Sequence, residues 1–267
     1  MSEFIIKGNI GEASRPRKRF WGKAAAVFLA ILASGLCRLE SAGAEEVRRI
    51  KIIAAASPNF RLNPRWRREI FERIAFANKI FEPQFGIRFS IKEYAFWNPR
   101  GEMFEPAGRV PEDFRALAPH QAADEIVMGF DKLTKPLGVK RSLVRERIGA
   151  AAVMQGVVVI RDPFDYTPPL VSKNTVAHEL AHVFGANHVA DETTIMYPKV
   201  SKAVKVCFDE ANARIIRAAR NMDFRKGPLS LSGEALETIG RVLRESPGFI
   251  QDGNFITHRR NLESIRK

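Results

Sequence analysis

The pattern of apolar and polar positions in the first half of the chain predicts a strand, a helix and a second strand. Residues 49–56 are mostly apolar and predict a buried strand, and residues 87–92 alternate, which is typical of a half-buried strand. Between them, Asn63 and Pro64 predict the start of a helix and Pro83 predicts its end. Apolar residues recur along one face of this helix: Trp66, Ile70, Ile74, Ala77 and Phe81.

The second half of the chain predicts further strands and then helices. Short apolar runs predict three strands, over residues 125–130, 149–154 and 157–160. Segments with apolar residues at helical spacing predict three helices, over residues 174–184, 209–220 and 234–244. We expect the tail, residues 249–267, to be a mobile end or a short docking segment. A strand, a helix, several strands and then helices predict a mixed α/β fold.

Residues 1–44 have the layout of a secretory signal. Basic residues at 15–19 precede an apolar run over residues 24–36, and Ala42 and Ala44 are the small residues that signal peptidase requires. A membrane-spanning helix needs roughly 20 apolar residues, which is more than this run contains. We therefore predict a protein that is secreted or exported to the periplasm. If the signal is not cleaved, the same segment would anchor the protein in the membrane and be its only contact with lipid.

The charge of the chain narrows the range of partners only a little. The 267 residues carry a net charge of +13, and outside residues 1–44 there are 36 basic and 27 acidic residues. Such an excess favours acidic partners in general, but it also fits a solvated basic surface. No segment combines clustered Lys and Arg with interleaved aromatic residues, so we expect no specific nucleic-acid binding.

The decisive stretch is residues 178–188, which hold three of the five histidines of the chain. On a helix, His178 and His182 lie on one face and can bind the same ion. Gly185 can take a positive φ and end the helix, after which His188 can return as a third ligand. Three imidazoles and a water give zinc the open four-coordinate arrangement of a catalytic site. The sequence therefore predicts one catalytic Zn²⁺ ion.

Glu179 lies next to the first of these histidines, where its carboxylate can reach a water on the ion without being a ligand. A carboxylate in that place can act as a general base, which predicts metal-assisted hydrolysis of a peptide bond. The two remaining histidines, His120 and His258, lie outside this stretch, and we interpret them as ordinary surface or loop residues.

The extended His-Glu-x-x-His-x-x-Gly-x-x-His pattern resembles the metzincin metallopeptidases, whose second mark is a methionine turn beneath the zinc. Met196, in the segment Thr-Ile-Met-Tyr-Pro, matches this mark and is similar to the matrixin branch, whereas residues 77–97 and 149–160 look more like reprolysin-type catalytic domains. Val189 departs from the better-known branches, which carry Ser, Asp, Glu or Pro there. The resemblance implies a metzincin fold: a twisted, mostly parallel sheet with an antiparallel edge strand, a zinc helix and C-terminal helices. It also implies a structural role for Met196.

The motif and the resemblance together predict a secreted zinc-dependent endopeptidase, with a peptidase domain over residues 45–225 and a C-terminal helix and tail over residues 226–267. The resemblance further implies protein or peptide substrates that bind along the edge strand near residues 149–153. We expect a monomer. Two alternatives stay open: a secreted binding protein that keeps the metal but cleaves no peptide, and a basic module that binds surfaces or nucleic acid. Glu179 favours the enzyme, because a binding protein has no need of that carboxylate.

Overall fold

The computed structural model describes residues 46–99, 114, 121–132, 149–162, 169–199, 203 and 205–265. The predicted export signal over residues 1–44 lies outside this part of the chain, and so does His120. Among the described residues, no helix has both the length and the apolarity that a membrane crossing requires.

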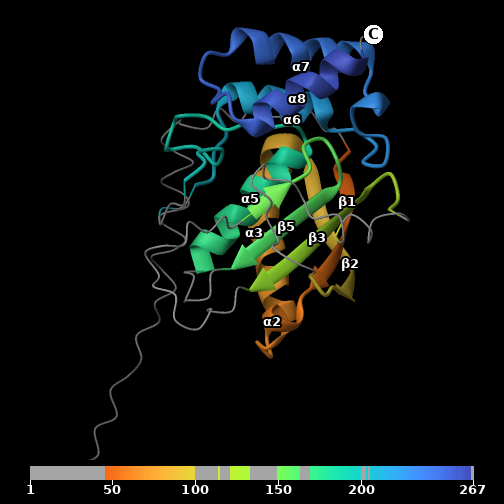
Figure 1. Ribbon diagram of the computed structural model, residues 1–267, viewed down its shortest axis with the longest axis vertical. Coiled ribbons are helices and arrows are strands. Elements are labelled where there is room, and N and C mark those ends of the chain that lie inside the picture. The colour runs from red at the N-terminus through yellow and green to blue at the C-terminus, as the bar shows by residue number, and fades with distance from the viewer. Residues whose placement is uncertain are drawn as a thin grey trace, which may run out of the picture. The chain divides into compact units, whose positions relative to one another are not determined.

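A five-stranded sheet forms the centre of the described domain (Figure 1). Its strands are β1 (Arg48–Ala56), β2 (Ile87–Phe96), β3 (Glu125–Lys132), β4 (Gly149–Ala151) and β5 (Val157–Asp162). They lie in the order β2-β1-β3-β5-β4, and only β4 pairs antiparallel with its neighbour. The prediction of a twisted, mostly parallel sheet with an antiparallel edge strand is therefore confirmed.

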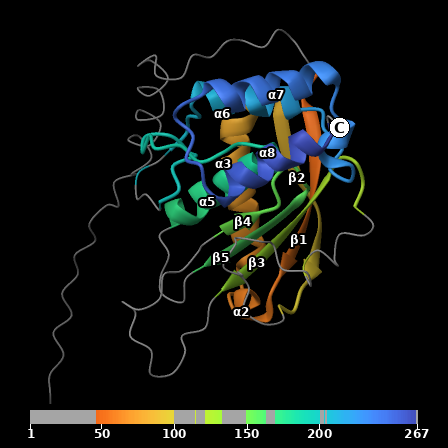
Figure 2. The same cartoon turned by 45° about the horizontal axis from the view of Figure 1, so that its top comes forward.

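Helices α3 and α5 pack against each other and against the same face of the sheet (Figures 1 and 2). The described helical segments are α2 (Pro58–Arg61), α3 (Trp66–Phe85), α5 (Pro169–Val183), α6 (Glu210–Ala219), the 3-10 turn η2 (Gly227–Ser230), α7 (Gly233–Glu245) and α8 (Gly253–Ile265). Alternate strand residues such as Ile52, Met128 and Val158 join α3 and α5 in the larger core. Their neighbours Val127 and Val157 fill a smaller core on the opposite face. Both faces are thus covered, as a mostly parallel sheet requires.

The boundaries of α3 differ from the sequence prediction at both ends. The helix begins at Trp66, two residues after Pro64, and it does not end at Pro83. A proline in the last turn removes one backbone hydrogen bond, but the remaining turn still forms. The helix ends instead at Gly86, whose φ of 60° lies in the left-handed region that glycine adopts without strain.

Of the two alternatives for the C-terminal tail, a mobile end is wrong for residues 253–265, which form helix α8. Phe255, His258 and Leu262 recur at helical spacing and are all buried, and the ring of Phe255 packs against Phe249. His258 is fully buried, so its interpretation as an ordinary surface or loop residue is also wrong. The expected domain boundary between residues 225 and 226 stays a prediction.

A buried ion pair connects α3 to the end of β5 and the start of α5. Arg73, only 1% exposed, donates from Nη1 to Oδ1 of Asp162 at 3.0 Å and from Nη2 to Oδ2 at 2.5 Å. Glu69 accepts from the same guanidinium at 2.5 Å, and the hydroxyl of Ser172 donates to Asp162 at 3.4 Å. A bidentate contact fixes direction as well as distance. This pair, with the bond from Ser172, therefore fixes the relative positions of α3, β5 and α5.

We expect Asp162→Ala to lower the free energy of unfolding by about 3–5 kcal/mol, because it leaves the buried guanidinium of Arg73 without its main counter-charge. Glu72→Ala is the control, since Glu72 pairs with Arg68 at 3.0 Å on the exposed face of the same helix. Loss of that surface pair should cost less than about 1 kcal/mol. Unfolding in urea, followed by circular dichroism, measures both values. Equal losses in the two variants would contradict the structural role of the buried pair.

Candidate metal centre

Helix α5 places His178 and His182 side by side, as their spacing predicted. Their Nε2 atoms lie 3.1 Å apart. The helix starts at Pro169, five residues before the predicted start, and ends at Val183. Both histidines therefore lie in its last turns, beside the point at which the chain reverses.

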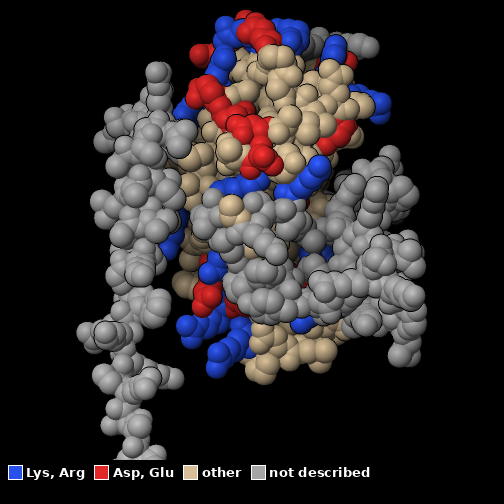
Figure 3. All heavy atoms as spheres, turned by 90° about the vertical axis from the view of Figure 1, so that its left-hand side faces the viewer, with Lys and Arg blue, Asp and Glu red and all other residues tan. Residues whose placement is uncertain are grey.

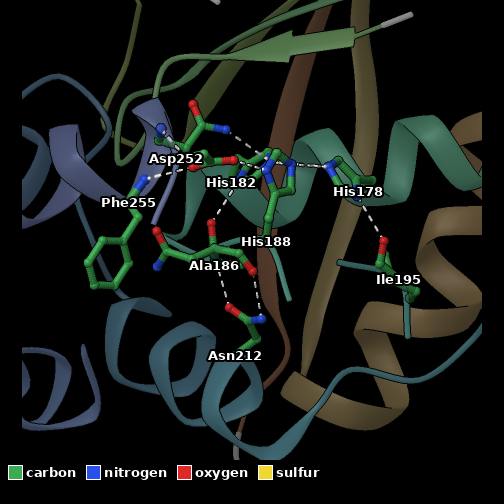
Figure 4. Close-up of polar contacts among 10 residues, drawn as sticks. His178, His182, Ala186, His188, Ile195, Asn212, Asp252 and Phe255 are labelled. Carbon is green, nitrogen blue, oxygen red and sulfur yellow. Dashed lines mark hydrogen bonds and ion pairs between the residues drawn. The ribbon is translucent and has the colours of Figure 1, made fainter. Parts of the chain in front are cut away.

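The turn after α5 returns the third histidine to the other two. Gly185 has a φ of 90°, and its N–H donates to the carbonyl of His182 at 2.9 Å. The chain then bends back, and the Nε2 of His188 reaches 3.0 Å from that of His178 and 3.2 Å from that of His182 (Figure 4). The structure thus brings together the three histidines that the sequence predicted, and a glycine makes the turn possible.

In each of the three imidazoles, Nδ1, which faces away from the cluster, forms a hydrogen bond to an oxygen. Nδ1 of His178 bonds to the carbonyl of Ile195 at 2.8 Å, and Nδ1 of His182 bonds to the carbonyl of Ala186 at 2.7 Å. Nδ1 of His188 bonds to the carboxylate of Asp252. Carbonyl and carboxylate oxygens only accept, so each Nδ1 carries a hydrogen, and in the neutral form of the ring Nε2 presents a lone pair.

Three lone pairs that face one another cannot satisfy one another by hydrogen bonds. Protonation does not resolve this conflict near neutral pH for the two helical rings. Burial, with a further contribution from the neighbouring rings, lowers the pKa of His178 to about 3 and that of His182 well below its usual value. A shared cation satisfies all three converging nitrogens at once.

The donor set fits a zinc ion. The three Nε2 atoms are 3.0–3.2 Å apart. Zinc bonds to histidine nitrogen at about 2.0–2.1 Å, and a tetrahedral ion separates its ligand nitrogens by about 3.3 Å. No other Asp, Glu, Cys or His of the described residues joins this cluster of His178, His182 and His188. Three ligands leave one position of a tetrahedral ion open to water or substrate.

Glu179 lies directly against the first residue of the edge strand β4. Its side chain is buried, with 6% of the residue exposed. A Cβ atom placed on Gly149 would lie 2.2 Å from Oε1 of Glu179 and 2.6 Å from its Cδ. Only a glycine therefore leaves room for the carboxylate in this position. The sequence placed Gly149 on the expected edge strand but indicated no contact with Glu179.

The segment around Met196 supports two of the three histidines through its main chain. The carbonyl of Ile195 accepts the hydrogen bond of His178, and the carbonyl of Met196 accepts one from the N–H of Val189 at 3.2 Å. Met196 itself is fully buried. The structural role that the resemblance implied for the Met196 side chain stays a prediction.

The C-terminal segment also contributes to the site, although no sequence motif indicates this. Oδ2 of Asp252 accepts from His188, while Oδ1 accepts from the N–H groups of Asn254 at 3.0 Å and Phe255 at 3.2 Å. Burial alone would raise the pKa of Asp252, but the hydrogen bond from His188 and the backbone N–H groups lower it below its usual value. The amide nitrogen of Asn254 lies 3.4 Å from Nε2 of His182. This segment therefore reaches the edge of the three-histidine cluster.

His258, the fourth histidine of the described residues, is not part of the cluster. Its Nδ1 lies 3.1 Å from the amide nitrogen of Asn187. Its ring fills the space beside Gly185, where an added Cβ would come within 2.8 Å of Cε1. Burial lowers the pKa of His258 to about 4. His258 thus packs α8 against the turn that precedes His188.

We expect zinc to stabilise the folded protein. Free zinc at a concentration 100 times its dissociation constant should raise the free energy of unfolding by about 2.7 kcal/mol. The substitution His182→Ala should remove most of this stabilisation. Thermal unfolding with added zinc and with a chelator measures the difference. An identical melting temperature in the two conditions would argue against a metal site.

Comparison with known proteins agrees with this geometry. Residues 68–189 match the family described as metallo-peptidase family M12B, reprolysin-like. The match begins within α3 and ends one residue after His188, so it contains all three histidines. No curated protein gives a significant match. The family match, the mostly parallel sheet and the three converging histidines are consistent with a metallopeptidase of the metzincin type.

Proposed function

We propose that the protein is a secreted zinc endopeptidase that uses Glu179 as its general base. One observation carries this proposal: the Nε2 atoms of His178, His182 and His188 converge within 3.0–3.2 Å, and the residue that follows His178 on the helix is a buried glutamate. Such a cluster can hold a cation and leave one position open, and the neighbouring Glu179 can take a proton there.

When bound, zinc would supply a Lewis acid for the scissile carbonyl and lower the pKa of a water molecule. The protein's own contribution is to place and move the proton. Glu179 takes the proton of the attacking water and delivers it to the leaving amine. The side chain of Glu179 is buried against Gly149, which limits the positions that the carboxylate can take.

The edge strand β4 supports an extended peptide as the substrate. Among the described strands, β4 pairs only with β5, and its residues Gly149–Ala151 leave one side of the strand without a partner. An extended peptide can pair with such an edge through main-chain hydrogen bonds. Because Glu179 contacts Gly149, a peptide on this edge would pass directly by the general base. A strand-like mode of binding suits cleavage within a chain, which favours an endopeptidase.

Export follows from the predicted signal over residues 1–44 and is part of the proposal. The charge of the visible surface gives little support to the alternative of a basic binding module. On the face drawn in Figure 3, acidic side chains lie among basic ones on the described surface, so that surface does not carry a single sign of charge. Binding to a nucleic acid or to anionic lipid would require a continuous basic surface.

We expect Glu179→Gln to keep zinc and lose turnover. The amide has the same shape but cannot accept a proton, so kcat should fall by roughly 10²–10⁴-fold. Hydrolysis of an unstructured protein such as casein, measured beside the zinc content of the purified variant, tests this. Undiminished hydrolysis by the variant would remove Glu179 from the mechanism. A wild-type protein that binds zinc but cleaves no member of a peptide library would instead favour the silent binding protein.

A second variant tests the position of Glu179 without changing its chemistry. Gly149→Ala should displace the carboxylate, since the added methyl would lie 2.2 Å from Oε1, and an error of about 1 Å can cost roughly 10²-fold in rate. Zinc binding should persist. Gly233→Ala is the matched control, because nothing lies within 4 Å of a Cβ at that position. Similar kcat/KM values for the two variants would contradict the proposed constraint.

A further inference from the structure

The three histidines differ in what holds them. The hydrogen-bond partners of His178 and His182 are main-chain carbonyls, which no side-chain substitution removes. His188 instead donates to a side chain, Asp252, which lies 64 residues further along the chain. The match to the metallopeptidase family ends at residue 189, so Asp252 lies outside the matched segment.

The backbone at His188 and Val189 is also held by main-chain contacts to the C-terminal segment. Val189 forms an antiparallel bridge with Phe249, and the N–H of Ile250 donates to the carbonyl of His188 at 2.9 Å. The chain from residue 249 to 252 therefore holds the backbone of His188 and, through Asp252, also its ring, as Figure 4 shows for the ring. Helix α8 then secures this stretch, because its buried face joins the main core.

The carboxylate of Asp252 is divided between two functions. Oδ1 accepts from two N–H groups at the N-terminus of α8, which is the contact of an N-cap residue. Oδ2 is left for Nδ1 of His188. A cap alone needs only one oxygen, and serine or threonine serves equally well. The second oxygen is what distinguishes Asp252 from an ordinary cap.

We infer that Asp252 is a positioning residue for the metal centre, and that the C-terminal segment, residues 249–265, is needed to hold His188 in place there. The inference rests on the proposed metal site. A carboxylate that accepts the Nδ1 hydrogen fixes the tautomer and orientation of a ligand histidine and makes its other nitrogen a stronger donor. Asp252 thus sets how firmly His188 binds the metal, although it does not touch the metal itself.

The test separates this function from helix capping. Asp252→Ser keeps an oxygen that can cap α8 but removes the acceptor of His188. Asp252→Asn keeps the size of the side chain and removes the charge. Ser232→Ala is the control: it removes the N-cap of α7, where the hydroxyl accepts from Ala235 at 3.2 Å, and leaves Asp252 intact. The dissociation constant for zinc is measured for the full chain by competition with a chromophoric chelator.

We expect Asp252→Ser to bind zinc roughly 10–100-fold more weakly than the wild-type protein, with a smaller loss for Asp252→Asn. Ser232→Ala should keep the wild-type dissociation constant. In the zinc-loaded wild-type protein, nitrogen NMR should show the hydrogen of His188 on Nδ1, and this signal should change in Asp252→Ser. Circular dichroism of each variant confirms that the helices are retained.

An unchanged zinc affinity in both Asp252 variants would overturn the inference. So would an equal loss in Ser232→Ala, because the effect would then reflect general stability. The proposed function fails in a different way. If the wild-type protein binds zinc and cleaves no peptide, the endopeptidase proposal is lost, but the effect of Asp252 on zinc affinity still stands or falls by its own measurement.

Discussion

The metal centre depends on the tautomeric state of three imidazoles. Each Nδ1 donates to an oxygen, so each Nε2 presents a lone pair, and the fold holds these lone pairs 3.0–3.2 Å apart. Burial lowers the pKa values of His178 and His182, so these two rings stay unprotonated near neutral pH. The folded chain without a cation therefore carries an unfavourable arrangement. A metal that removes this conflict contributes its binding free energy to the stability of the fold.

The oxygens that accept hydrogen bonds from the three histidine rings come from separate parts of the chain, so the whole domain is needed to form the metal centre. Ala186 belongs to the turn after α5, Ile195 to the methionine turn and Asp252 to the C-terminal segment. The sheet contributes from the other side, where Gly149 receives the carboxylate of Glu179. The helix that carries two of the histidines is in turn fixed to the sheet through the buried pair of Asp162 with α3.

Local spacing made the centre of the site predictable from the sequence, whereas its surroundings were not. Two histidines four residues apart share a helix face whatever the rest of the chain does, and Gly185 marks a turn by its own freedom of φ. The contact between Gly149 and Glu179 left no pattern, because a glycine has no side chain to read. Asp252 meets His188 across 64 residues, which only the tertiary fold determines. Helix α8 was missed because it opens with Asp-Gly-Asn, residues that are typical of turns.

The position of Asp252 also explains how a carboxylate can stay ionised in a half-buried place beside the site. Two N–H groups at the start of α8 bond to Oδ1, and the positive end of the helix dipole favours a negative charge there. The charge is then available to Nδ1 of His188 through Oδ2. The residue after His188 is the apolar Val189, which pairs with Phe249, and the carboxylate that bonds to the ring comes from the C-terminal segment. The same helix N-terminus that orders the end of the chain therefore also sustains the acceptor of the third histidine.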